Sequence, residues 1–278
     1  MNVQSGMVTV VTEITGSSEG VRVGYEPAHA LLRVTIDNGP GNRIGLAQVG
    51  RLLDIATRLS TLESAADECR VVVLDAVGAD FSHGANLSDP ALIARLSEGH
   101  DARLAFARRG QELVSRWRAI PVPTIAVATG QVVGAGACLF MASDFRIAAP
   151  ATAIRFPEID RGMHLGWGIV PRLLSLLGEP RTLKLALLGE ALDVSDLADT
   201  VTVACDPPGE VLCLAAGLAA KAPLAVRAIL DVLRQSQLAS GAGADTDAER
   251  WADTLASADF AEAMAAWYGR RAANWKGR

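Results

Sequence analysis

Cysteine is scarce in this 278-residue chain, and no two of its four cysteines have the CxxC spacing of a metal or redox site. All of them lie in apolar surroundings, which predicts reduced thiols in a cytoplasmic protein rather than a disulfide framework. The four are Cys69, Cys138, Cys205 and Cys213.

Clusters of basic residues and long apolar runs are also missing. The chain carries 26 Lys and Arg against 31 Asp and Glu, for a formal net charge of −5, and its arginines are scattered. Because phosphate binding needs a basic face, no nucleic-acid partner is expected. No uncharged apolar run reaches about 18 residues, so no membrane span is expected. The segment 1–16 lacks the basic start and cleavage site of a signal peptide.

The histidines do not suggest a metal site. His29, His100 and His164 show neither i, i+4 spacing nor a nearby carboxylate of the kind that metal sites use. No metal is therefore expected.

Apolar residues make up half of the chain, which is enough to bury one core with an appendage at this length. Residues 1–20 have the character of an extension with at most one edge strand. From residue 21 onward strands and helices alternate, and from residue 168 the pattern becomes helical. The sequence thus predicts an α/β front half and an all-helical back half.

In the front half, the apolar periodicity predicts a hairpin, two helices and a buried strand. Residues 21–37 alternate apolar and polar side chains around a turn, which is typical of a hairpin. Residues 46–62 and 104–120 have helical spacing. The continuous apolar run after Arg70 predicts a strand buried on both faces. Residues 96–103 are polar and are expected to form a loop or a frayed helix.

In the back half, helices are expected at about 168–178, 181–189, 209–221 and 223–239, the first of them closed by Gly178. The last block has a pair, Asp259 and Glu262, with the spacing of a capping box. Its aromatic anchors are Trp251, Phe260, Trp267 and Trp275.

Residues 121–159 hold most of the candidate chemistry. A strand leads into a Gly/Ala-rich loop at 130–136, and an apolar helix is expected to begin near Ala135. The loop matches neither GxGxxG nor the Walker pattern, so nucleotide-phosphate binding is not favoured. Two readings remain: a tight turn between closely packed strands, or a site where N–H groups of a helix N-terminus meet a substrate.

A second small-residue turn, residues 81–88, follows the buried strand. Two such turns could supply the two donors of an oxyanion hole. Taken alone, His83 fits a packing or surface role better than a catalytic one, and Cys138 fits an inert buried thiol. Glu158 lies between apolar neighbours, which would raise its pKa by desolvation and suit an acid/base. The other interpretation is a glutamate on a surface loop.

Four separated segments of this chain together resemble the crotonase (enoyl-CoA hydratase/isomerase) superfamily. They are residues 81–87, 120–163, 171–193 and 259–278, and the likeness covers nearly the whole of 21–278. The resemblance implies an α/β fold, a crotonase-like spiral of β-β-α units over 21–200, and a C-terminal helical trimerisation region over 201–278. It also implies an acyl-CoA substrate and a homotrimer or dimer of trimers.

Carried over onto this sequence, the resemblance places the two oxyanion donors at the N–H groups of His83 and Ala135. Of the two glutamates that the family's hydratases use, one falls on Glu158 and the other on Cys138, so one carboxylate is missing. Asn86 also replaces the usual aspartate.

One carboxylate suffices to move a double bond, whereas hydration needs a base for water and a proton donor. The resemblance therefore favours Δ3-Δ2 enoyl-CoA isomerisation slightly over hydration. The alternatives are hydration with His83 as second acid/base, decarboxylation, thioester hydrolysis, or a catalytically silent acyl-CoA-binding paralogue.

Contacts to the CoA thioester are expected from both turns and from the C-terminus. The expected residues are Phe81, Gly84, Ala85, Gly134 and Lys276. Coenzyme A enters as part of the substrate, and no separate cofactor is expected.

Overall fold

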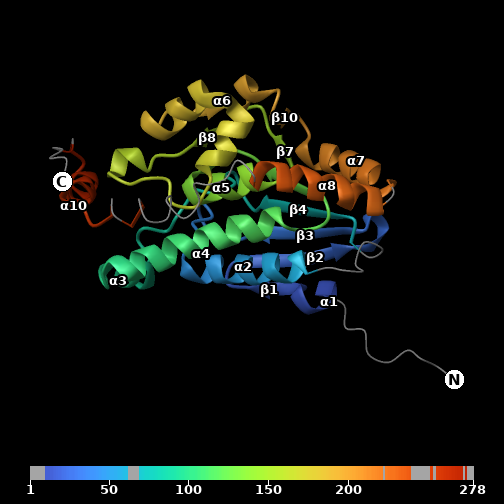
Figure 1. Ribbon diagram of the computed structural model, residues 1–278, viewed down its shortest axis with the longest axis horizontal. Helices are drawn as coiled ribbons and strands as arrows, with labels where there is room; N and C mark the ends of the chain where they lie inside the picture. The colour runs from blue at the N-terminus through green and yellow to red at the C-terminus, as the bar shows by residue number, and fades with distance from the viewer. Residues whose placement is uncertain are drawn as a thin grey trace.

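The computed structural model describes residues 10–61, 69–221, 223–238, 251–252, 255–271 and 273. Within them, seven strands form one large sheet, drawn in Figure 1. In spatial order they are β1 (Gly16–Ser18), β2 (Val21–Glu26), β3 (Leu31–Ile36), β4 (Val71–Ala76), β5 (Thr124–Ala128), β7 (Phe145–Ala148) and β10 (Thr202–Val203). A small sheet contains β6 (Gln131–Val133), β8 (Ala153–Arg155) and β9 (Leu192–Asp193).

The helices predicted from the sequence are present, but those at 10–14 and 90–97 were not predicted. The back half is not all helical, as was expected, because it contains the short strands β9 and β10. The helices are α1 (Val10–Ile14), α2 (Leu46–Ser60), α3 (Pro90–Ser97), α4 (His100–Arg118), α5 (Gly134–Ala142), α6 (Val170–Leu187), α7 (Pro207–Ala219), α8 (Pro223–Leu238) and α10 (Ala258–Tyr268). Short 3-10 turns are η1 (Pro27–His29), η2 (Ile159–Arg161) and η3 (Val194–Leu197). No helix of the described ranges is both long and apolar enough to cross a membrane.

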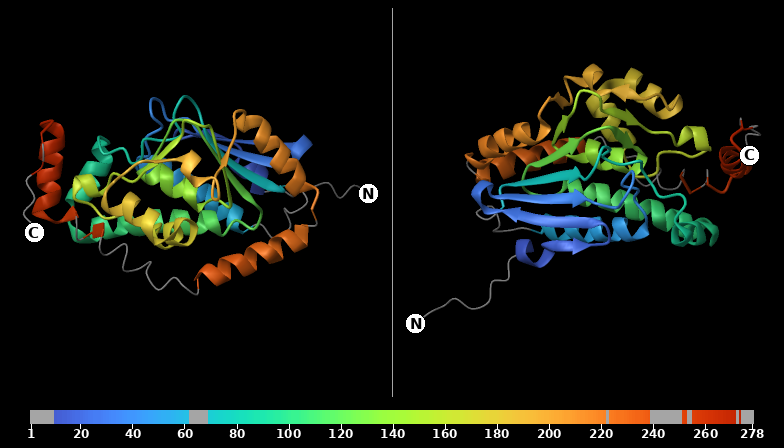
Figure 2. Two further views of the ribbon diagram at one scale, coloured as in Figure 1. Left: turned by 90° about the horizontal axis from the view of Figure 1, so that it is seen from above. Right: turned by 180° about the vertical axis from the view of Figure 1, so that it is seen from behind.

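The large sheet is antiparallel over β1, β2 and β3 and parallel from β3 to β10. This confirms the predicted hairpin at 21–37. In the rear view of Figure 2 the first strands lie in front of α2 and α4. The opposite face of the sheet packs on α7.

The prediction that β4 is buried on both faces is confirmed. Val72 and Leu74 join the main core, whereas Val71 and Val73 belong to a second cluster that contains Val211 of α7. A strand covered on both sides has no solvent-facing position, which explains its continuous apolar sequence.

Helix α5 is buried at every position, and none of its residues, Gly-Ala-Gly-Ala-Cys-Leu-Phe-Met-Ala, carries a charge. A helix that is apolar all round must lie inside the molecule. Its N-terminus follows β6, so the first turn of α5 is held close to the ends of the parallel strands.

The structure decides one local prediction that the sequence left open between a loop and a frayed helix, and it shows that another is wrong. The stretch 96–103 is mainly helical, because α3 reaches Ser97 and α4 begins at His100. The N-cap of α10 is Ser257, whose Oγ accepts the Phe260 N–H at 3.0 Å, so the expected pair of Asp259 and Glu262 does not form the cap.

Two further expectations concern Gly178 and the cysteines. Gly178 has φ 70° and breaks α6 where the helix end was predicted, although a second helical stretch follows at once. Cys205 and Cys213 are exposed, which contradicts the apolar surroundings expected for them, whereas Cys69 and Cys138 are buried. Trp275 lies outside the described residues.

Candidate active site

The two small-residue turns lie against each other. The Ser82 N–H donates to Gln131 O at 3.0 Å, and the Val133 N–H donates to Ser82 O at 2.9 Å. A Cβ built on Gly136 would lie 2.4 Å from the Cβ of Ser82, so only glycine permits this approach. The turns after β4 and β5 therefore form one unit.

Gly84 and Gly134 sit at the centre of this contact. Gly84 has φ 82°, and a Cβ on it would lie 3.0 Å from Val133 O and 3.6 Å from Ala135 N. Gly134 has φ 51°, and a Cβ on it would lie 2.9 Å from Oε1 of Glu158. Glycine is thus required at both positions for conformation and for space.

The N–H of His83 is not a free donor, which corrects the sequence prediction. It donates to the carbonyl oxygen of Gly41 at 2.7 Å. Because a backbone N–H carries one proton, it cannot also bind a thioester oxygen without breaking that bond.

The N–H of Ala85 faces the other way. Ala85 forms a parallel bridge with Ile44, in which the Ile44 N–H donates to Gly84 O at 2.8 Å and the Asn86 N–H donates to Ile44 O at 2.9 Å. The neighbours of Ala85 thus make the bridge, and the N–H of Ala85 itself points away from Ile44.

The N–H of Ala135 belongs to the first turn of α5. The first N–H groups of a helix have no partner within it, and Val133 before the helix makes no side-chain cap. Since Gly134 has a left-handed φ, regular helical dihedrals begin at Ala135. Ala85 and Ala135 line the same cavity.

Glu158 is held at the start of η2, where its carbonyl accepts the N–H groups of Arg161 at 3.0 Å and Met163 at 2.9 Å. The residue is partly exposed, but its Oε2 atom is buried and has no hydrogen-bond partner among the described residues. Burial raises the pKa of Glu158 from 4.5 to about 7, while the charge of Arg161 acts in the opposite direction. A carboxyl group that titrates near neutral pH can both take and return a proton.

Two small cavities of about 50 Å³ each meet at Glu158. We call them the inner and the outer cavity; Ala85, Leu87, Glu158 and Met163 line both. The inner cavity also contains Ala135 and Cys138, and the rest of its wall is mostly apolar: Leu92, Leu96, Phe106, Leu165, Trp167 and Trp251.

The outer cavity is more polar than the inner one and carries positive charge. Arg43 and Arg161 line it together with His83, and the Arg161 guanidinium lies 5.9 Å from the ring centroid of Trp267. Helix α10, which supplies Trp267, contacts η2 and lies at the end of the molecule away from α7 and α8 (Figure 1).

The ring of His83 is tied to Asp80. Its Nε2 lies 2.9 Å from Asp80 Oδ2, and Asp80 Oδ1 accepts the Gln131 N–H at 2.8 Å. These two contacts, the backbone bond first, lower the pKa of Asp80. The other side of the ring packs on Gly41, where a Cβ would lie 3.0 Å from His83 Cγ.

The other expected contact residues divide into three groups. Gly84, Ala85 and Gly134 line the outer cavity. Phe81 is only 1% exposed and packs edge-on against Phe140 with ring centroids 5.8 Å apart, so its side chain belongs to the core and not to a substrate site. Lys276 lies outside the described residues.

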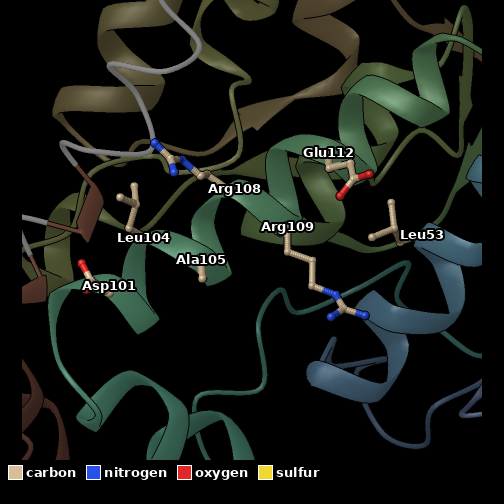
Figure 3. Close-up of a pocket in the computed structure, with 7 residues that line it drawn as sticks. All are labelled: Leu53, Asp101, Leu104, Ala105, Arg108, Arg109 and Glu112. Carbon is tan, nitrogen blue, oxygen red and sulfur yellow. The ribbon is translucent and has the colours of Figure 1, made fainter.

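A larger hollow, shown in Figure 3, has a volume of about 660 Å³ but contains none of these groups. It lies on α4, with Leu53 of α2 at one end, and its charged side chains are Asp101, Arg108, Arg109 and Glu112. The hollow is larger than the other two cavities, but Glu158 and the two small-residue turns line those smaller cavities and not this one.

Sequence reasoning missed Arg43, Arg161 and the aromatic wall of the inner cavity. Arg161 comes three residues after Glu158, which within a single turn brings both to one side, and this spacing was a usable signal. In the described part of the chain, no three His, Cys, Asp or Glu side chains gather to hold a metal ion.

Comparisons with known proteins point to one family. The family model for enoyl-CoA hydratase/isomerase matches residues 50–278. A probable enoyl-CoA hydratase of Bacillus subtilis (strain 168) is 29% identical over 257 residues, covering 88% of this chain and 94% of the relative. The 2,3-dehydroadipyl-CoA hydratase of Escherichia coli (strain K12) is 28% identical and covers 79% of this chain and 87% of that protein.

The fold has close counterparts among solved structures. The crystal structure of an enoyl-CoA hydratase from Mycobacterium avium superposes with a TM-score of 0.80 at 23% identity, covering 94% of this chain and 100% of that one. With the family model matched over most of its length, this chain belongs to the enoyl-CoA hydratase/isomerase family and has the crotonase fold.

Proposed function

We propose that this protein moves the double bond of an enoyl-CoA thioester between positions 3 and 2. The observation that carries the proposal is the buried carboxylate of Glu158, whose Oε2 has no partner among the described residues and which lines one cavity together with Ala85 and Ala135. Among the residues that the structure describes, Cys138 and Glu158 are the two titratable ones on the inner cavity wall.

In the proposed reaction the two N–H groups bind the thioester oxygen. The Glu158 carboxylate takes a proton from C2 of a 3-enoyl thioester, and the electron pair passes to the oxygen as a dienolate. Two donors stabilise that oxyanion where the charge develops. The protonated Glu158 then returns the proton at C4, which leaves a 2-enoyl thioester and regenerates the carboxylate.

Hydration is the second candidate, supported by the names of the relatives. It would need one group to activate water and another to protonate C2. The ring of His83 lies in the outer cavity and is bound to Asp80, so a water would have to link it to the reacting carbon.

The outer cavity suits the CoA part of the substrate. Arg43 and Arg161 present guanidinium groups there, and guanidinium groups bind phosphate oxygens well. We place the phosphates of CoA against this face, with Gly84 and Gly134 letting the thioester approach the backbone. Lys276 remains a proposed phosphate contact.

The proposal is tested by incubating the protein with 3-enoyl-CoA and 2-enoyl-CoA separately. Formation of 2-enoyl-CoA from the first substrate is the expected result. If the protein hydrates 2-enoyl-CoA and does not isomerise 3-enoyl-CoA, the isomerase proposal is wrong and the protein is a hydratase. Turnover of neither substrate would overturn both, and retained binding of CoA would then identify a non-catalytic acyl-CoA-binding protein.

The pH dependence follows from the environment of Glu158. As a base it must be ionised, so kcat/KM should rise with pH through about 7. Arg161→Gln removes a positive charge that favours the carboxylate, and the midpoint should therefore move to higher pH. Arg43→Gln, on the same cavity, is the control and should raise KM without moving the midpoint. An unchanged midpoint in Arg161→Gln would contradict this role of Arg161.

We also propose that the protein assembles as a trimer or a dimer of trimers. Helices α6 and α8 expose large apolar side chains, among them Leu174, Leu187, Ile229, Val232 and Leu233. Exposed apolar groups of this kind commonly mark interfaces between subunits. Light scattering should give a mass three or six times the 29.1 kDa of one chain, and a monomer would contradict the proposal.

A further inference from the structure

The inner cavity is closed by three aromatic rings. The Phe106 ring centroid lies 6.4 Å from that of Trp167 and 5.5 Å from that of Trp251. All three side chains are buried, with exposures of 5%, 6% and 7%. They line the cavity beside Ala135 and Glu158, so the wall belongs to the same space as the reacting groups.

Two glycines fix the positions of the indole rings. A Cβ on Gly110 of α4 would lie 2.2 Å from Trp167 Nε1, and a Cβ on Gly166 would lie 2.3 Å from Trp251 Cγ. Neither glycine has a positive φ, so the backbone itself would accept alanine at both positions. The absence of a side chain is therefore explained by the room that each indole occupies.

This wall leaves little space. The inner cavity has a volume of about 50 Å³, whereas pockets for drug-sized ligands span roughly 300–1,000 Å³. One water needs about 10–15 Å³ in the same measure, so the cavity holds roughly three to five non-hydrogen atoms. With the thioester carbon at the N–H groups, these atoms correspond to the acyl carbons from C2 onward.

We infer that the protein selects short, apolar acyl groups of about four to six carbons, and that Trp167 and Trp251 set this limit. The inference rests on the proposed function, because it takes the inner cavity as the acyl site. Among the described residues, the titratable side chains that line this space are Glu158 and Cys138, and neither supplies a positive counter-ion for a charged acyl end.

The test measures binding of saturated thioesters, which have no double bond to move, by isothermal titration calorimetry. Butyryl-CoA should bind wild type at least tenfold more tightly than decanoyl-CoA. Trp251→Ala and Trp167→Ala should open the wall and shift this affinity ratio at least tenfold toward decanoyl-CoA. Trp251→Leu is a milder variant, checked by its melting curve, and should shift the ratio in the same direction.

Trp267→Ala is the matched control, because Trp267 lines the outer cavity and not the inner one. It should change the affinity for both thioesters by the same factor. Equal binding of butyryl-CoA and decanoyl-CoA to wild type would overturn the inference and leave the proposed function standing. An unchanged ratio in folded Trp251 and Trp167 variants would overturn the role of those side chains. Binding of neither thioester would overturn the proposed function, and the inference with it.

Discussion

Glu158→Gln is expected to lower kcat by about 10²–10⁴, because a positioned acid/base contributes that much to proton transfer. The amide keeps the size of the side chain but can neither take a proton from C2 nor return one at C4. Measurement of kcat with 3-enoyl-CoA tests this directly. Glu179→Gln, an exposed substitution on α6, is the control and should leave kcat unchanged. Undiminished turnover in Glu158→Gln would remove Glu158 from the mechanism.

The same substitution should stabilise the fold above neutral pH. Because the pKa of Glu158 is raised from 4.5 to about 7, the folded state holds a proton that the unfolded state loses between these values. Wild-type stability therefore falls as pH rises through this window, by up to ~3 kcal/mol at ~1.4 kcal/mol per pKa unit.

Glutamine has no such titration. Urea unfolding at pH 5 and pH 8 should show a small gain for Glu158→Gln over wild type at the lower pH and a larger gain at the higher one. A gain of equal size at both values would mean that ionisation of Glu158 does not cost the wild type stability.

Ala135→Pro is expected to lower kcat/KM by about 10²–10³, the usual effect of losing one oxyanion donor. Proline lacks an N–H, and it is well accepted at the first position of a helix. Although α5 is counted from Gly134, the φ of 51° at that glycine is left-handed, so the helical dihedrals begin at Ala135. Asp101→Pro, in the first turn of α4, is the control: it should fold and turn over like wild type. Wild-type kcat/KM in a folded Ala135→Pro protein would contradict the donor assignment.

Local pattern was sufficient for much of the fold. The hairpin at 21–37, the doubly buried β4 and the apolar α5 each have a periodicity that the chain carries within a few residues. The small sheet was not foreseen, because β6 and β8 have three residues each and their pairing joins segments 22 residues apart in register. A strand of three residues is too short to show an alternation of apolar and polar side chains.

The candidate site also has parts that the sequence predicts and parts that it does not. Glu158 and the two turns could be found from residue type and spacing, but the choice of donor could not. Which N–H of the turn faces the cavity depends on Ile44 and Gly41, some 40 residues away, because their backbones take up the hydrogen bonds of His83 and Asn86. The inner wall likewise joins Phe106, Trp167 and Trp251, which no sequence window contains.

The contact between Gly84 and Gly134 has a consequence for how such a protein can be changed. The backbone of Gly84 lies directly against that of Val133 and Gly134, so backbone contacts space the N–H groups of Ala85 and Ala135. Cys138, three residues after Ala135 and therefore on the same face of α5, lines the inner cavity and is not part of that backbone contact. A scaffold of this kind separates activation of the thioester from the choice of reaction, and a carboxylate introduced at position 138 would add a second proton carrier for the acyl carbons or for a bound water.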